Sequence, residues 1–255
     1  MRCSLCRQTS CKSPLLREMI TSRLLPRIAI VVPVYNEADS VIKTLSALAC
    51  YRARGHRIIV VDGGRTDSTP ELSAPFADVV ICSSKGRALQ QNAGAKLADA
   101  DVLLFLHADT ALPDHADSLI IVAMSDGKVW GRFDVSIVGR LRWLKLISTL
   151  MNIRSRLTGI ATGDQAIFVR KSVFEQIGGF AEIPLMEDIE LSKRLKKLGR
   201  PACLKARVTT SGRRWETDGL CKTVILMWKL RLLYFLGSSP NRLAKLYRDT
   251  RDGRK

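Results

Sequence analysis

Residues 28–37 read IAIVVPVYNE, a run of β-branched residues that ends in polar side chains. Such a run predicts a strand that is buried on both faces of a sheet. The following residues place Val41, Leu45 and Leu48 at helical spacing. A buried strand followed by an amphipathic helix is typical of α/β proteins, so this stretch sets the predicted fold class.

The same alternation continues along the first half of the chain. Further buried strands are predicted in RIIVVD (57–62), DVVIC (78–82) and DVLLFL (101–106). The segments TPELSAPFADVV and GRALQQNAGAKLA read as the helices between them. This order predicts a mostly parallel, Rossmann-like central sheet with flanking helices in a single domain.

The second half is less regular. KVWGRFDVSI (128–137) and DQAIFVRKSVF (164–174) are predicted to be strands on either side of a basic, apolar helix at 140–152. MEDIELSKRLKKLG (186–199) predicts an amphipathic helix that ends at a glycine. The expected organisation is a flexible basic extension (1–26), one domain (27–240) and a basic tail (241–255). Within that domain we expect a nucleotide-binding half at about 27–125 and an acceptor half at about 126–236.

The composition is that of a basic globular protein. The 255 residues are 46% hydrophobic, and 41 Lys and Arg against 24 Asp and Glu give a net charge of +17, with basic residues gathered at both ends. This charge favours a nucleic acid, an anionic membrane face or a phosphate-bearing substrate. Because no nucleic-acid-binding motif is present, no specific nucleic-acid partner is expected.

The cysteines and the N-terminus indicate a cytoplasmic protein. Seven cysteines without regular spacing argue against a secreted disulfide scaffold. Cys3, Cys6 and Cys11 could hold zinc but have no fourth ligand nearby, so a loose extension is the favoured interpretation. Residues 1–27 lack the apolar core of a secretory signal, which leaves a transit peptide or a start at Met19 as alternatives.

Residues 220–236 form a second apolar segment. About 17 residues is the lower limit for a membrane span, but the segment contains Lys222, Lys229 and Arg231. We therefore expect it to dock against the domain and to allow, at most, peripheral contact with the inner face of the membrane.

Polar motifs follow three of the predicted strands: PVYNE, DGGRTDST and HADT. In open parallel sheets, ligands bind at the carboxyl ends of the strands. Together with GRALQQNAGA and MEDIELSKRLKKLG, these motifs resemble those of family 2 glycosyltransferases, which have the GT-A fold, over about residues 28–236. The pairing with TTSGRRWE resembles a small bacterial branch of transferases associated with radical-SAM and selenium-related genes.

The resemblance implies a donor site for a nucleotide-diphosphate sugar. Asp62 would accept a hydrogen bond from the base or ribose, although Gly63 departs from the family's usual second aspartate. Arg87 would bind a phosphate, or be a solvated cation at a helix start. The remaining residues implied to bind the nucleotide are Pro33, Tyr35, Asn36, Glu37 and Asn92.

The resemblance also implies a metal. HAD stands where the family has a D-x-D motif, so Asp109 would hold Mg²⁺ or Mn²⁺ as a carboxylate ligand. His107 replaces the first aspartate. It could ligate Mn²⁺, hydrogen-bond the ribose or a phosphate, or cap the strand end.

Asp188 matches the family's catalytic base, which takes the proton of the acceptor hydroxyl in an inverting transfer. The residues implied on the acceptor or diphosphate side are Asp164, Gln165, Glu187, Arg213, Arg214 and Trp215. The acceptor could be a small molecule, a lipid carrier or a glycan. The alternatives are a basic protein that binds nucleic acid or a membrane surface, or another nucleotide-dependent transferase on the same fold.

Overall fold

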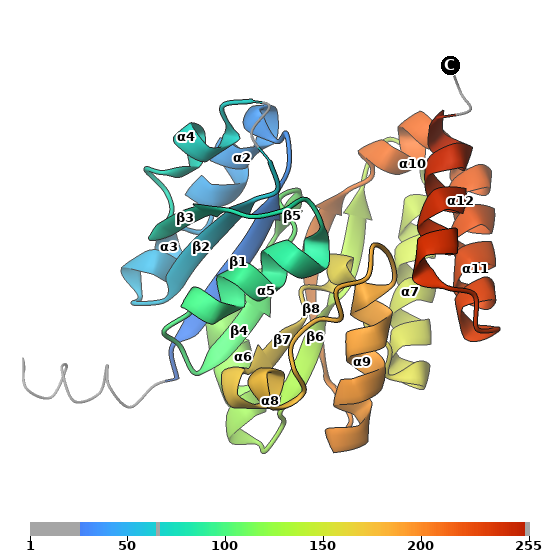
Figure 1. The fold of residues 1–255 in the computed structure, drawn as a ribbon. Coiled ribbons are helices and arrows are strands. Elements are labelled where there is room, and N and C mark those ends of the chain that lie inside the picture. Colours follow the sequence, from blue (N-terminus) through green and yellow to red (C-terminus); the bar gives the residue numbers. More distant parts are fainter. Residues whose placement is uncertain (1–25, 65–66, 253–255) are drawn as a thin grey trace, which may run out of the picture.

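The computed structural model describes residues 26–64 and 67–252. An eight-stranded sheet in the order β3-β2-β1-β4-β7-β6-β8-β5 runs through the molecule (Figure 1). The strands are β1 (Ile28–Val34), β2 (Arg57–Asp62), β3 (Val79–Cys82), β4 (Val102–Phe105), β5 (Thr110–Ala111), β6 (Trp130–Val138), β7 (Phe168–Arg170) and β8 (Ala202–Ser211).

The first half of the sheet forms as the sequence predicts. Strands β3, β2, β1 and β4 are parallel neighbours. Their register aligns Val34 with Asp62 and Asp62 with Cys82, so these strands end at the same edge. Since the polar motifs follow directly, the fold brings them together at this edge.

Helices cover both faces, because the strands bury side chains on both sides. Helices α2, α3, α6 and α7 contribute to the core on one face, and α5, α8 and α9 to the core on the other. The helices are α2 (Ala38–Ser46), α3 (Ala49–Ala53), α4 (Thr69–Ser73), α5 (Arg87–Leu97), α6 (Ala116–Ser125), α7 (Leu144–Thr158), α8 (Lys171–Gln176), α9 (Glu187–Leu198), α10 (Arg213–Asp218), α11 (Leu220–Phe235) and α12 (Pro240–Asp252), with a short 3₁₀ helix η1 (Gly163–Gln165).

The second half differs from the sequence prediction in two elements. The strand expected over 164–174 is only 168–170, because η1 precedes it and α8 follows it at once. This short β7 is antiparallel to both β4 and β6, whereas β6 and β8 are parallel. The helix expected at 140–152 forms four to six residues later, at 144–158. The result is a mixed sheet within one α/β domain.

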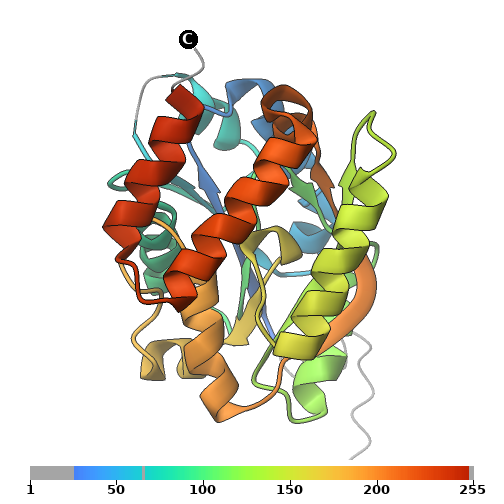
Figure 2. The ribbon, with the colours of Figure 1, turned by 90° about the vertical axis from the view of Figure 1, so that its right-hand side faces the viewer.

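Helices α11 and α12 lie side by side next to α7 and α9 (Figure 2). Leu230 of α11 and Leu243 of α12 are fully buried and form a third core with Ile160, Met186 and Ile189. The residues expected to be a basic tail therefore form a packed helix as far as Asp252. Among the described residues, no helix combines the length and apolar character that a membrane crossing requires. Cys3, Cys6 and Cys11 lie outside the described residues.

Candidate active site

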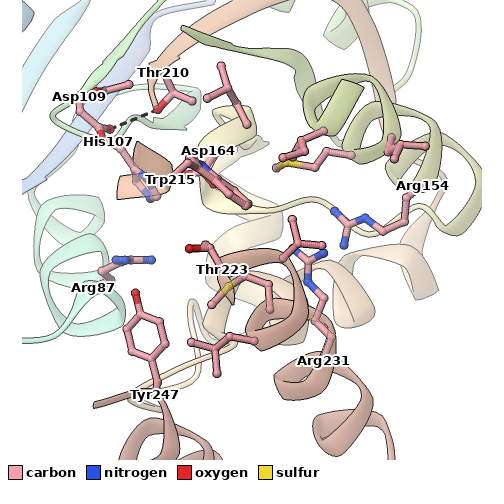
Figure 3. A pocket seen from close by; sticks show the side chains of 18 of the residues that line it. Arg87, His107, Asp109, Arg154, Asp164, Thr210, Trp215, Thr223, Arg231 and Tyr247 are labelled. Carbon is pink, nitrogen blue, oxygen red and sulfur yellow. Dashed lines mark hydrogen bonds and ion pairs between the residues drawn. The ribbon is translucent and has the colours of Figure 1, made fainter. Parts of the chain in front are cut away.

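A cavity of about 780 Å³ opens at the polar ends of β1 and β4 and extends between α7 and α11 (Figure 3). The cavity forms here because the parallel strands β1 and β4 end at one edge of the sheet and α11 lies across that edge. The predicted residues that line the cavity are Pro33, Tyr35, Glu37, Arg87, His107, Asp109, Asp164 and Trp215.

One side of the cavity lies at the end of β1, which is paired with β2. Tyr35 is partly exposed, and the ammonium of Lys85 lies 3.9 Å from the centre of its ring. Asp62 is fully buried; one carboxylate oxygen accepts from the Gly64 amide at 3.1 Å, and the other has no partner among the described residues. Asp62 does not line the cavity, and its unpaired buried oxygen is energetically costly.

The side chain of Gln90 explains why position 63 is a glycine and not the aspartate that is usual in the family. Its side-chain amide donates to the carbonyls of Val34 and Val61 at 2.7 and 2.8 Å and so ties the ends of β1 and β2 together. A Cβ at Gly63 would lie 3.0 Å from the Gln90 amide. A second aspartate would therefore press on this amide.

The end of β4 carries the two residues of the HAD motif. Asp109 is exposed to the cavity, and its Oδ1 lies 3.4 Å from the hydroxyl of Thr210 on β8. The Nδ1 of His107 lies 3.2 Å from the carboxylate of Asp164. The backbone of Gly163 lies close to the opposite edge of the imidazole ring: a Cβ at Gly163 would lie 2.5 Å from the Nε2 of His107.

Asp188 lies at the start of α9, behind His107. Its Oδ2 accepts a hydrogen bond from the Gly163 amide at 2.9 Å. Together with Glu187, it lines a small space of about 10 Å³ separate from the main cavity, and His107 lines both spaces. Met186, which has a left-handed backbone (φ 71°), turns the chain into the helix.

Glu187 is a buried carboxyl beside a second carboxyl. Burial raises the pKa of Glu187, the negative charge of Asp188 raises it further, and Arg87 opposes both. The Arg87 guanidinium lies 3.8 Å from Glu187, and its side chain is 47% exposed. Burial lowers the pKa of Arg87, but the carboxylates of Glu187, Asp164 and Asp188 outweigh this and raise it.

The side chains fit a divalent cation only in part. No group of three His, Cys, Asp or Glu residues within 26–64 and 67–252 could hold a metal by itself. Asp109 offers one carboxylate at the cavity wall, and Mg²⁺ sites commonly use one or two carboxylates together with phosphate oxygens and water. The donor set therefore fits an ion that arrives with a diphosphate.

Several predicted residues lie elsewhere. The Asn92 side chain donates to the Phe180 carbonyl and accepts from the Phe180 amide, both at 2.9 Å, so it joins two segments outside the cavity. Gln165 is fully buried and accepts from the Thr162 amide. Asn36 and Arg213 are exposed and do not line the cavity. The side chain of Arg214 lies outside the described part of the structure.

Sequence reasoning missed two arginines of the cavity wall, Arg154 on α7 and Arg231 on α11. Burial lowers the pKa of Arg154 to about 10, the positive Arg231 adds to this, and Asp188 opposes it. Burial also lowers the pKa of Arg231, against Asp188 and Asp164. The signal was a cation within an apolar helix, which periodicity alone cannot assign to a site.

The sequence of residues 29–178, more than half of the chain, matches the model of the family described as "Glycosyl transferase family 2". The chain belongs to this family. Curated relatives of this family 2 chain include "Probable glycosyltransferase YdaM" of Bacillus subtilis, 26% identical over 69% of this chain and 48% of the relative. Poly-beta-1,6-N-acetyl-D-glucosamine synthase of Staphylococcus aureus is 27% identical over 68% of this chain and 46% of the relative.

Solved structures share the fold of this family 2 domain. The mannosyltransferase PcManGT of Pyrobaculum calidifontis, in complex with GDP-Man and Mn²⁺, aligns with a TM-score of 0.55 and 20% identity, over 74% of this chain and 57% of that one. TarS (1–349) of S. aureus aligns with a TM-score of 0.57 and 17% identity, over 75% and 63%. These likenesses confirm the GT-A fold. The chain spans about half the length of the curated relatives it matches.

Proposed function

We propose that this chain transfers a sugar from a nucleotide-diphosphate sugar to an acceptor hydroxyl, with inversion at the anomeric carbon. The position of His107 carries the proposal. It lines both the cavity that contains Asp109 and the small space that contains Asp188, and this supports a reaction centre between the two carboxylates. The motif pairing with TTSGRRWE adds the proposal that the chain belongs to the branch associated with radical-SAM and selenium-related genes.

Each residue then has a role. Tyr35 and Asp62 bind the nucleoside, while Arg87 binds a phosphate oxygen. Asp109 would hold Mg²⁺ or Mn²⁺, which supplies positive charge to the leaving diphosphate. As the acceptor oxygen bonds to the anomeric carbon, the bond to the diphosphate breaks with its electron pair, and Asp188 takes the hydroxyl proton.

The first test concerns donor binding. We expect Mn²⁺ to increase the thermal stabilisation of the native protein by GDP, UDP or their sugars, and to have no such effect on Asp109→Ala. Equal metal dependence in both proteins would exclude Asp109 as a ligand. His107→Asp restores the usual motif and should retain the Mg²⁺ response. Loss of all nucleotide binding would instead show that the imidazole itself is needed.

The second test separates catalysis from folding. Asp188→Asn keeps the size of the side chain and can cap α9 about as well. It cannot take a proton, so transfer should fall about 10²- to 10⁴-fold while nucleotide stabilisation persists. Near-native transfer by Asp188→Asn would rule out Asp188 as the base.

A further inference from the structure

Two arginines of the cavity form no ion pair within the described parts of the chain, although Asp188 is near enough to raise the pKa of both. The Nε and Nη2 of Arg154 are buried without a hydrogen-bond partner in the described parts of the chain. Arg231 likewise has no hydrogen bond or ion pair with any residue of 26–64 or 67–252. Figure 3 shows the two guanidinium groups side by side, across the cavity from Asp109.

This arrangement is costly without a ligand. Buried guanidinium groups are normally paired, and two like charges in one cavity repel each other. Burial and then the positive charge of Arg231 lower the pKa of Arg154, while Asp188 opposes them. A single anion between the groups would satisfy both, with forked hydrogen bonds of the kind that arginine makes to phosphate.

The wall beside these arginines is apolar and open to solvent. Leu150, Ile153, Leu157 and Trp228 all line the cavity. They are also 51%, 48%, 82% and 69% exposed, so they form the mouth of the cavity. Large exposed apolar side chains continue at Trp143, the residue before α7, and along α7 and α11 at Leu146, Ile225, Leu232 and Phe235. We call this whole surface the apolar mouth.

The charges around the apolar mouth indicate what covers it. Lys145, Lys222 and Lys229 are exposed on the same two helices. An apolar surface with basic neighbours is typical of proteins that contact anionic lipid. The cavity thus combines an anion site with an apolar exit, as a phosphate group attached to acyl chains requires.

We propose that the acceptor is a glycerophospholipid with a free hydroxyl on its headgroup. Its phosphodiester binds Arg154 and Arg231, its acyl chains leave over the apolar mouth, and its hydroxyl oxygen attacks the anomeric carbon. The proton passes to Asp188 and the nucleoside diphosphate leaves with the bonding electrons. This inference rests on the proposed function. A diester fits better than a terminal phosphate, because an ionised phosphate oxygen would need no base.

Vesicle flotation tests the lipid. We expect the native protein to bind phosphatidylcholine vesicles that contain phosphatidylglycerol at least about tenfold more tightly than phosphatidylcholine alone. Arg154→Gln with Arg231→Gln should abolish this preference, whereas the control Arg200→Gln, an exposed arginine after α9, should keep it. Leu157→Ser should weaken binding to both vesicles, and the control Leu97→Ser, 49% exposed on α5, should not. An unchanged lipid preference in the double arginine variant would overturn the inference.

Donor binding distinguishes failure of this inference from failure of the proposed function. The double arginine variant should still be stabilised by UDP or GDP with Mn²⁺. If that stabilisation is lost, the two arginines bind the donor diphosphate and the lipid inference is wrong, although the transferase proposal stands. If no nucleotide stabilises even the native protein, the proposed function fails, whatever the vesicles show. A native dimer that Leu157→Ser dissociates would show that a second copy covers the apolar mouth, which also contradicts the inference.

Discussion

At the scale of single residues, His107 joins the two sides of the site. The sequence predicts its place after β4 and leaves its role open between ligand, hydrogen-bond donor and cap. Its partner is Asp164, which lies 3.2 Å away but 57 residues later in the chain. Sequence spacing cannot reveal such a pair, because the placement of the intervening β5, α6, β6 and α7 is not known from sequence. Asp164 thus places a carboxylate beside the imidazole of His107.

Gly163 is the residue that allows this arrangement. A Cβ there would lie 2.5 Å from Nε2 and 2.6 Å from Cε1 of His107, so in Gly163→Ala either the ring or the backbone at position 163 must shift. Overpacking of this kind costs about 1–3 kcal/mol. We expect a corresponding loss of unfolding free energy in urea, with weaker nucleotide binding. Gly199→Ala is the control, because a Cβ there meets nothing within 4 Å. Equal stability of the two variants would contradict the close approach at Gly163.

Glu187 should make stability depend on pH. Its pKa is raised in the folded protein, chiefly by burial and then by Asp188, so its ionisation costs folding free energy. The cost is absent below the unfolded pKa of about 4.3 and fully present above the folded pKa. Glu187→Gln should therefore increase stability relative to the native protein more at about pH 8 than at about pH 4. Thermal unfolding at both pH values checks this.

The control for that measurement is Glu182→Gln, because Glu182 is exposed. Glu187→Gln also removes the ion pair with Arg87. This should change the free energy of unfolding little, because the two charged groups lie 3.8 Å apart and Arg87 is about half exposed. A difference between Glu187→Gln and the native protein that does not change with pH would contradict the buried-carboxyl interpretation.

At the scale of elements, Asn92 fixes α5 to the segment that leads into α9. Both hydrogen bonds of its amide go to the backbone of Phe180. Asn92→Ala would leave the Phe180 amide and carbonyl without these partners, which costs about 1–3 kcal/mol for each group that stays buried. Urea unfolding should show this loss. The control Lys96→Ala, at an exposed position of the same helix, should change stability by less than about 0.5 kcal/mol.

The elements that sequence predicts best are those with the strongest local pattern. β1, β2, β3 and β4 are apolar runs bounded by polar motifs, and all four form. β7 could not be predicted as a three-residue strand, because its pairing with β4 and β6 is a tertiary effect. α12 is not predicted from sequence because its many charges resemble those of a tail, although Leu243 is fully buried. The motif that contains Asn92 gives its position in the sequence but not the direction of its amide, which points to the Phe180 backbone.

At the scale of the whole molecule, the sheet joins the two predicted halves. β4 pairs with β7, and β5 pairs with β8, so strands of both halves share one hydrogen-bonded sheet. We therefore expect one cooperative unfolding transition in which far-UV circular dichroism and tryptophan fluorescence coincide. Two separate transitions would indicate that the halves fold independently.

The β4–β7 and β5–β8 pairings should hold the two halves together even if the chain between them is cut. The turn at Gly127, exposed and with a φ of 81°, separates the strands up to β5 from those after it. A protease that cut there would sever the chain but neither the β4–β7 nor the β5–β8 ladder. The two pieces would remain together as a tight heterodimer. Expressed separately, each would expose an unpaired strand edge and would be expected to aggregate until mixed with its complement.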